Sequence, residues 1–267
     1  DTPYKISSLR LDAFNGTTIA YYTGIVGGNS TTTTANVANR FLFDRRQSNS
    51  VQYWSPSIAG LTVRAAYGAN EERATGGNAS LNPWMGSVSI AWDSGPFYVG
   101  GAYEQHKEYG GVDSAKDWAA KVFASFKFGT VTLGLMGERL KYQGFSAATT
   151  SHKGTINAST SPLSSGLEIT DYYASLGWQF GPNNLAFTYG ADQKVEINGS
   201  ENSNAKARQF SVRYAYDLSK RTQFYAMATK IDNKSNSANV FGINPIVTPG
   251  AAGQDPQGVG VGFRHVF

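Results

Sequence analysis

The chain has 267 residues, no cysteine, 30 glycines, 15 tyrosines and 15 phenylalanines. Its net charge of +4 comes from interspersed acids and bases, which excludes the basic stripe of a nucleic-acid-binding protein. A sequence without cysteine forms no disulfides or cysteine metal sites, and its three scattered histidines do not make a metal centre, so we expect no cofactor. No apolar run reaches the ~18 residues of a transmembrane helix, but a transmembrane barrel of alternating strands needs no such run.

An alternation of apolar and polar residues begins near residue 48 and recurs to the end of the chain. In the stretch 171–180, for example, Tyr172 and Leu176 share one face, and Ser175 and Gln179 share the other. Because successive side chains of a strand point to opposite faces, each such stretch predicts a two-faced β-strand. The eleven predicted strands cover residues 48–57, 61–69, 84–93, 96–107, 116–128, 131–142, 168–180, 184–195, 206–217, 222–232 and 257–267.

The connections between the predicted strands alternate in length. Tight turns on one side and long polar loops on the other are typical of an up-and-down outer-membrane barrel. We therefore predict an all-β fold, an antiparallel up-and-down transmembrane β-barrel. The short turns lie at 58–60, 94–95, 129–130, 181–184 and 218–221, and the long loops lie at about 70–83, 108–115, 143–167, 196–205 and 233–256.

Aromatic residues gather near the ends of the predicted strands, on the apolar face. Rings at such positions suit the membrane–water interface, where an amphipathic ring contacts both lipid and water. The alternative is a soluble β-sandwich, which also alternates but has shorter strands. Strands of about ten or more residues, long enough to cross a bilayer when tilted, favour the barrel. The aromatic residues assigned to this girdle are Trp54, Trp84, Trp92, Trp118, Phe126, Phe128, Trp178, Phe180, Tyr214, Tyr216 and Phe267.

Three motifs, in this order along the chain, resemble the general porins of β-proteobacteria. They are RQSNSVQYWSP at 46–56 followed by IAGL at 58–61, YDLSKRT at 216–222, and VGFRHVF at 261–267. These porins are trimeric, sixteen-stranded barrels of the Gram-negative outer membrane. The resemblance covers essentially the whole chain and implies an outer-membrane location, a homotrimer and the passive passage of small hydrophilic solutes.

The resemblance also implies that the chain is the C-terminal portion of a longer barrel. Sixteen strands are expected in the intact protein and about eleven here, so five strands, roughly 90–100 residues, would be missing. Residues 1–44 resemble the third loop of the family, which folds into the lumen. We therefore divide the chain into a constriction loop with its lead-in (1–47) and barrel strands (48–267). The alternative is a twelve-stranded barrel with an extra strand near 36–46.

Ionisable residues opposite the apolar faces are expected to line the lumen. An Arg or Lys on the lipid face near the bilayer midplane costs ~2–4 kcal/mol, which supports this assignment well inside a strand. Near strand ends, as at Lys127 and Lys194, snorkelling weakens the argument. The expected inward bases are Arg46, Arg64, Lys121, Lys127, Lys194, Arg213 and Arg264, and the inward acids are Glu104, Glu138 and Asp192.

In the resembling family, a basic wall cluster faces an acidic loop at the constriction. Arg46 matches the family arginine that stands ten residues before the proline of the first motif. Asp12 in the loop would stand opposite the wall arginines and set up a transverse field. For Arg46, Arg64, Arg213 and Arg264, a place at the constriction and general lining of the lumen remain open. The neighbouring charges Arg10, Arg45 and Asp44 are interpreted as solvated.

More inward bases than acids predict a general diffusion porin with weak to moderate anion preference, because rings of bases favour anions. A substrate-specific channel for anionic metabolites is the first alternative. An outer-membrane barrel enzyme is a weaker alternative. His106 and His152 are the only candidates for a catalytic histidine near the rim of the barrel, and no serine lies in a GxSxG motif. The last alternative is a soluble β-rich binding protein.

The last ten residues, GVGVGFRHVF, have the pattern of a full strand. Val261 and Phe263 would face lipid, Arg264 would face water, and Phe267 would lie in the aromatic girdle. The resemblance implies that this strand, ending in Phe267, is the signal for the barrel-assembly machinery. The other expected partners are outer-membrane lipid and lipopolysaccharide. With the first strands missing, residues 258–267 would lack the partner strand that closes the barrel.

Overall fold

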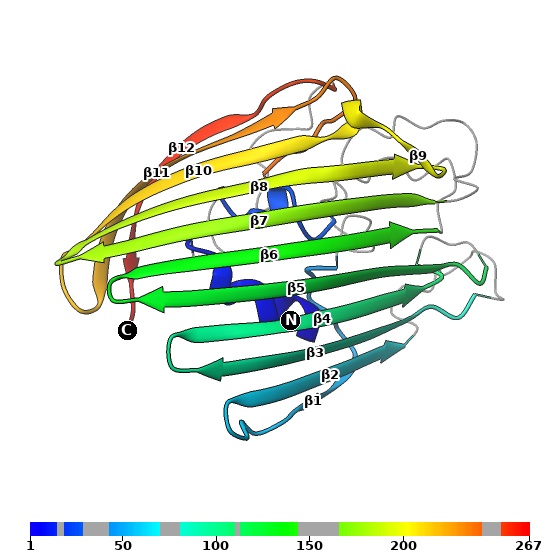
Figure 1. The fold of residues 1–267 in the computed structure, drawn as a ribbon, viewed down its shortest axis with the longest axis horizontal. Coiled ribbons are helices and arrows are strands. Elements are labelled where there is room, and N and C mark those ends of the chain that lie inside the picture. Colours follow the sequence, from blue (N-terminus) through cyan, green and yellow to red (C-terminus); the bar gives the residue numbers. More distant parts are fainter. Residues whose placement is uncertain (15–18, 29–42, 70–80, 110–112, 144–165, 242–251) are drawn as a thin grey trace.

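The computed structural model describes residues 1–14, 19–28, 43–69, 81–109, 113–143, 166–241 and 252–267. One antiparallel sheet dominates it, and eleven of its strands follow one another in chain order (Figure 1). A further two-residue strand, β9 (Ser200–Glu201), pairs with β8 beside this series. The eleven are β1 (Ser50–Trp54), β2 (Leu61–Ala69), β3 (Trp84–Ser94), β4 (Phe97–Lys107), β5 (Lys116–Phe128), β6 (Val131–Tyr142), β7 (Leu167–Phe180), β8 (Asn183–Ile197), β10 (Ala207–Asp217), β11 (Thr222–Asn233) and β12 (Gln257–His265).

The predicted antiparallel, up-and-down arrangement is confirmed. All eleven predicted strands are present in the predicted order, and nearly all their bounds agree within two residues. The strand β1 differs most, because it ends at Trp54 rather than near residue 57. Pro56 has no N–H group to continue the ladder, which accounts for the early end.

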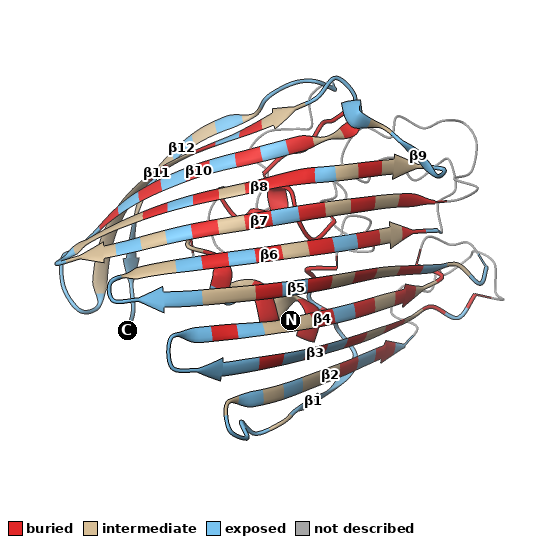
Figure 2. Ribbon diagram, in the orientation of Figure 1, coloured by how far each residue is buried: buried red, intermediate tan, exposed pale blue. Residues whose placement is uncertain are grey.

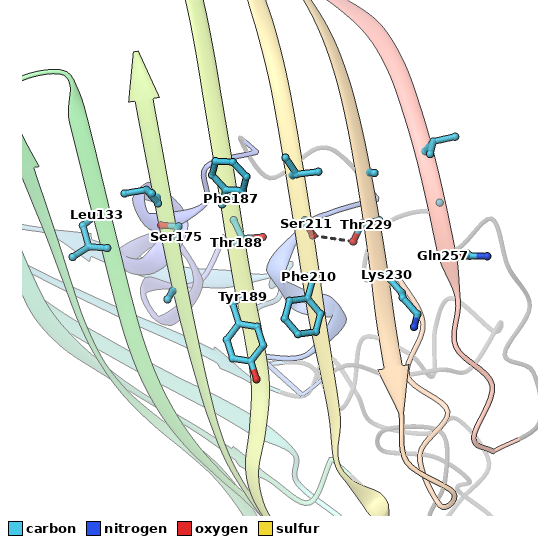
Figure 3. Close-up of a pocket in the computed structure, with 16 residues that line it drawn as sticks. Leu133, Ser175, Phe187, Thr188, Tyr189, Phe210, Ser211, Thr229, Lys230 and Gln257 are labelled. Atoms are coloured by element: carbon cyan, nitrogen blue, oxygen red, sulfur yellow. Dashed lines mark hydrogen bonds between the residues drawn. The ribbon is translucent and has the colours of Figure 1, made fainter. Parts of the chain in front are cut away.

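Strict alternation gives the sheet two different faces. Along β10, buried and exposed residues alternate from Ala207 to Tyr216 (Figure 2). Phe210 and Val212 are exposed on one face, which we call the outer face, whereas Ser211 and Arg213 are buried on the other, the inner face. Large apolar side chains are exposed on the outer face across the whole sheet, as predicted for a surface that meets lipid.

Glycines form the tight turns between neighbouring strands. Gly95, Gly129 and Gly181 have φ angles of 56°, 55° and 58°. Residues with a Cβ rarely adopt this conformation, whereas glycine adopts it freely, and short hairpin turns require it. The turns predicted from the sequence at these positions therefore set the order of the strands.

The N-terminal segment, whose described residues are 1–14, 19–28 and 43–44, packs against the inner face. Helix α1 (Pro3–Ser8) contacts β3 and β4, and the short helix η1 (Leu9–Leu11) contacts β5 and β6 (Figure 1). Thr2 caps α1, since its hydroxyl accepts from the Lys5 amide at 3.4 Å. None of the described helices is long and apolar enough to cross a membrane.

The apolar core lies between this segment and the inner face. Tyr4 and Phe43 pack with Leu140 and Tyr142 in one cluster. A second cluster joins the short helix η2 (Tyr22–Gly24) and η1 to the sheet. Its sheet side is made by Tyr98, Phe123, Met136 and Tyr173. The segment is thus held on the wall by buried aromatic contacts, each worth roughly 0.5–1.5 kcal/mol beyond the area that it buries.

The strands β1 and β12 form the two edges of the sheet. Within the described residues, β12 pairs with β11 alone, β1 pairs with β2 alone, and the sheet does not close on itself. This agrees with the expected lack of a closing partner beside residues 258–267. The alternative of an extra strand near 36–46 concerns residues that lie mostly outside those described.

Trp54 lies on the inner face, so its assignment to the lipid-facing girdle is wrong. Its partner in the β1–β2 ladder is Arg64, and the guanidinium carbon of Arg64 lies 5.0 Å from the centroid of its ring. Residues paired across a ladder share a face. The outer-face residues of β1 are instead Val51 and Tyr53. The position within the strand, rather than the apolar character of the ring, decides the face.

Lys194 lies on the outer face, so its expected inward orientation is also wrong. Asp171 pairs with Asp192 but Thr170 pairs with Lys194, which leaves Gln193 as an extra residue in β8. Such a β-bulge shifts every later residue of the strand to the other face. The Lys194 Nζ consequently lies 2.9 Å from Glu196 Oε1 on the outer side.

Candidate functional site

Lys121 of β5 joins the N-terminal segment to the inner face. Its Nζ donates to Asp44 Oδ1 at 2.7 Å and to Ser8 Oγ at 2.9 Å. The same ammonium lies 3.8 Å from the centroid of the Tyr4 ring. The side chain points inward, as expected, but it has no exposed surface and therefore does not face water.

Glu138 of β6, opposite Lys121 in the ladder, completes this buried cluster. It accepts from the Gly27 amide at 2.6 Å and from the Tyr4 hydroxyl, and its Oε2 is 3.8 Å from Lys121 Nζ. Asp44 is fully buried here, which corrects its interpretation as a solvated charge. Lys121, Glu138 and Asp44 together form what we call the anchor cluster. Its charges are paired with one another, as buried charges require.

Glu104 of β4 is also buried and pairs with His106. The Nε2 of His106 is 2.8 Å from Glu104 Oε1. The imidazole is stacked between the rings of Phe43 and Tyr109, with each pair of centroids 4.5 Å apart. Glu104 therefore does not line an aqueous surface, and the His106 imidazole is not presented to a substrate. The second candidate histidine, residue 152, lies outside the described residues.

A second charged group surrounds Arg213 of β10. Its Nη2 donates to Asn184 Oδ1 at 2.8 Å, and its guanidinium carbon lies 5.5 Å from the centroid of the Phe14 ring. Asp12 and Arg264 both interact with it electrostatically. Asp12, whose Oδ1 accepts from the Phe14 amide at 3.1 Å, thus lies near an arginine of the wall.

A third group, which we call the turn-side cluster, consists of Arg10, Trp54, Arg64 and Tyr98. Arg64 lies over the Trp54 ring and also interacts with the Tyr98 side chain. The guanidinium carbon of Arg10 lies 4.3 Å from the centroid of the Tyr98 ring, and Arg10 forms an ion pair with Asp93. The Tyr98 hydroxyl donates to a backbone oxygen of α1 at 2.7 Å.

Arg45 and Arg46, which directly follow the N-terminal segment, differ in exposure. The Arg46 side chain is 84% exposed, and its Nε is 3.3 Å from Asp1 Oδ1. Arg46 thus contacts Asp1, and Asp12 interacts electrostatically with Arg213. Arg45 is buried with its guanidinium carbon 5.1 Å from the centroid of the Tyr109 ring, so it is not the solvated charge expected from the sequence.

The bases and acids of this side of the molecule differ in exposure. Among the described acids of the inner face, Glu104, Asp117, Glu138, Asp171 and Asp192 are buried, whereas Asp217 of β10 is partly exposed and accepts hydrogen bonds from Gln179 and Gln223. Asp93 is half-exposed but paired with Arg10. By contrast, Arg46, Lys127 and Arg264 are exposed and Arg64 is partly exposed. Water in front of the described inner face therefore meets more exposed basic than exposed acidic side chains.

Burial keeps the tyrosine hydroxyls of the segment protonated. It raises the pKa of Tyr4 well above the ordinary value of 10.0, and the nearby charge of Glu138 raises it further. Burial, together with Asp44, has the same effect on the pKa of Tyr22. Tyr4 therefore remains a hydrogen-bond donor to Glu138 over the physiological pH range.

Sequence reasoning missed the residues that hold the segment in place, namely Tyr4, Ser8, Phe43 and Asp44. Asp44 and Lys121 are 77 positions apart, and no local pattern connects them. The inward position of Trp54, in contrast, follows from counting across the hairpin from Arg64. Across the described ranges, no group of three or more His, Cys, Asp or Glu side chains is placed to hold a metal ion.

Comparison with known proteins places these features in a family. The family described as Gram-negative porin matches residues 8–236. Outer membrane porin protein 32 of Delftia acidovorans is 25% identical over 224 residues, which are 83% of this chain and 57% of that protein. The chain thus spans little more than half the length of this relative.

Solved porin structures have the same fold. An anion-selective porin from Comamonas acidovorans superposes with a TM-score of 0.75 at 20% identity, covering 100% of this chain and 72% of that one. The trimer form of OmpT from Vibrio cholerae gives a TM-score of 0.57 at 13% identity, covering 86% and 66% of the two chains. Since the family match extends over most of its length, the chain belongs to the Gram-negative porin family and so to the bacterial outer membrane.

Proposed function

We propose that the intact protein is a general diffusion porin that passes small hydrophilic solutes with a weak to moderate preference for anions. The observation that carries the preference is the exposure of bases and burial of acids on the inner face. The same preference is named for the similar porin from Comamonas acidovorans. Membership of the porin family points to a channel rather than an enzyme.

Electrostatics supplies the mechanism. In a barrel wide enough to hold water, the charges on the wall act on every solute that passes. Arg64 and Arg264 keep exposed surface on the inner face, whereas most of the described acids there are buried and the partly exposed Asp93 and Asp217 contact other side chains. Low-dielectric walls strengthen the resulting field relative to bulk water, and basic rings favour anions.

We further propose that residues 1–47 form the constriction. The segment packs on the inner face through the anchor cluster and through Asp12 near Arg213. In a closed barrel, that face is the lumen wall, so the segment would narrow the channel. Within this proposal, Arg213, Arg264 and Asp12 lie at the constriction, Arg46 and Arg64 line the aqueous path, and Lys121, Glu104 and Glu138 hold the segment.

The assembly of the intact protein is part of the proposal. Sixteen strands, a number found among porins, would close the sheet whose edges are β1 and β12. A homotrimer is supported by the trimer form of the similar OmpT structure. The exposed outer face would contact outer-membrane lipid and lipopolysaccharide, and the last strand with Phe267 would be read by the barrel-assembly machinery.

The reversal potential of the reconstituted channel tests the proposed function. The intact protein is inserted into planar bilayers with a gradient of KCl at low ionic strength. The proposal predicts a potential of the sign that reports chloride permeating faster than potassium. A potential that reports faster potassium would contradict the anion preference. A general porin passes a series of solutes up to a cutoff in solute size. Conductance that saturates as the concentration of one solute rises would instead indicate a substrate-specific channel.

A further inference from the structure

We propose that the turn-side cluster is a binding subsite for aromatic carboxylates, in which Arg64 binds the carboxylate and Trp54 stacks on the ring. The proposal rests on the proposed function, because the solute must first enter an aqueous channel. It goes further by naming a solute class and the two side chains that select it. Four observations support it: the face, exposure, hydrogen bonding and charge of these residues.

Trp54 offers an exposed aromatic surface on the inner face of the sheet. Trp54 is 48% exposed as a residue of the edge strand β1, and it lies on the inner face, as its pairing with Arg64 shows. Its Nε1 donates to Gln52 Oε1 at 3.1 Å, so the polar edge of the indole already has a partner. The exposed apolar face of the ring is therefore what remains for a passing solute.

Arg64 offers a charge that is not paired with a carboxylate. Within the described part of the chain, Arg10 pairs with Asp93 and Lys121 with Asp44, but no carboxylate forms an ion pair with Arg64. A guanidinium presents a planar fork of N–H donors that matches a carboxylate with two parallel hydrogen bonds. Its position over the indole, 5.0 Å from the ring centroid, also restrains the side chain beside that ring.

These two groups together favour an aromatic carboxylate over other anions. Because the guanidinium carbon lies 5.0 Å from the centroid of the indole, a carboxylate bound to Arg64 would bring an attached aromatic ring close to the part of the Trp54 ring that Arg64 leaves uncovered. Stacked aromatic pairs gain attraction that an aliphatic ring of similar size does not. Phosphate or chloride would use Arg64 but gain nothing from Trp54. Arg10, over the Tyr98 ring, is paired with Asp93, so the charge that this cluster offers to an anion is that of Arg64.

Current block by two matched solutes tests the subsite. The intact protein in planar bilayers is titrated with benzoate and with cyclohexanecarboxylate, which have the same charge and similar size. We expect benzoate to block at the lower concentration. Trp54→Leu should raise the half-blocking concentration of benzoate about three- to tenfold and leave that of cyclohexanecarboxylate unchanged. Trp54→Phe should lie between, and Arg64→Gln should weaken block by both solutes.

Trp178→Leu is the matched control, because Trp178 is an exposed tryptophan of the outer face. It should leave the ratio of the two half-blocking concentrations at the wild-type value. Equal block by the two solutes in the wild-type channel, or an unchanged ratio in Trp54→Leu, overturns the subsite. Because this ratio is measured within one channel, it does not depend on the chloride-to-potassium preference. The reversal potential of the same channels judges the proposed function separately.

Discussion

Lys121 shows how one buried charge controls the N-terminal segment. Its ammonium binds Asp44 and Ser8 and lies close to Glu138 and the Tyr4 ring, with no exposed surface. Removing one partner of a buried ion pair typically costs about 3–5 kcal/mol, because the other charge remains buried without compensation. The docking of the segment therefore depends strongly on this residue.

Lys121→Met should release the segment from the wall. The variant leaves Asp44 and Glu138 as neighbouring buried carboxylates, so the docked state loses about 3 kcal/mol or more. We expect faster protease cleavage within residues 1–44 of the intact protein and a larger single-channel conductance.

The double variant Lys121→Met/Asp44→Asn is the control for this prediction. It removes one of the two uncompensated carboxylates and should recover part of the protease resistance. Lys127→Met, a change at an exposed inner-face lysine of the same strand, should leave protease resistance unchanged. Equal cleavage of the wild-type protein and Lys121→Met would contradict the anchoring role.

Glu108, directly after β4, provides a pH-dependent contact in a loop. Its Oε1 is 2.8 Å from Lys107 Nζ, and its carboxylate accepts from the amides of Asn82 and Ser114. These contacts hold the pKa of Glu108 below its ordinary value of 4.5. Because the pKa is lowered in the folded state, the stabilisation is fully present above about pH 4.5 and is lost as the pH falls through the folded-state pKa.

Hydrogen exchange of the Asn82 and Ser114 amides should therefore show protection factors that fall on acidification. In Glu108→Gln, protection should be lower at neutral pH and nearly independent of pH in the same range. The amides within β5 and β6 serve as the internal reference. Wild-type protection that stays constant down to pH 3 would contradict this assignment.

At the scale of elements, alternation and turn chemistry made most strands predictable. The strands β5 and β6 have the predicted bounds, because local alternation and a turn glycine at Gly129 specify both of them. The bulge at Gln193 was not predictable, since a regular strand and a bulged one have the same composition. The anchor cluster was not predictable either, because the contacts that form it are distant in sequence and depend on tertiary packing.

The face assignment of β1 can be tested with single cysteines, because the native chain has none. Gln52 pairs with the inner-face Ala66, and Val51 pairs with Tyr67 on the outer face. Gln52→Cys in the intact protein should react with a membrane-impermeant maleimide. Val51→Cys should react only with a lipid-soluble one. The reverse pattern would move Trp54 to the lipid side and remove the basis of the subsite.

The described part of the molecule combines an apolar outer face with a charged inner face on one sheet that does not close on itself. A strand edge carries unpaired backbone groups, which are costly in lipid, so both β1 and β12 need further partners in a membrane. The exposed bases and mostly buried acids of the described inner face together create the field that the proposed anion preference requires. This preference is a collective property, since the contributing bases are spread over several strands.

The anion preference should therefore depend on salt in a graded way. The Debye length falls from about 10 Å at 0.1 M to about 3 Å at 1 M, a range in which charges distributed over a wall lose their influence on the channel centre. We expect the chloride-to-potassium permeability ratio to decrease steadily toward one between these concentrations. Arg64→Gln and Arg264→Gln should each lower the ratio at 0.1 M and have little effect at 1 M. Lys194→Gln, on the outer face, should change it at neither concentration, because lipid and protein separate that charge from the channel. A ratio that does not vary with salt would instead require a narrow, desolvated binding site, and would contradict selection by a diffuse field.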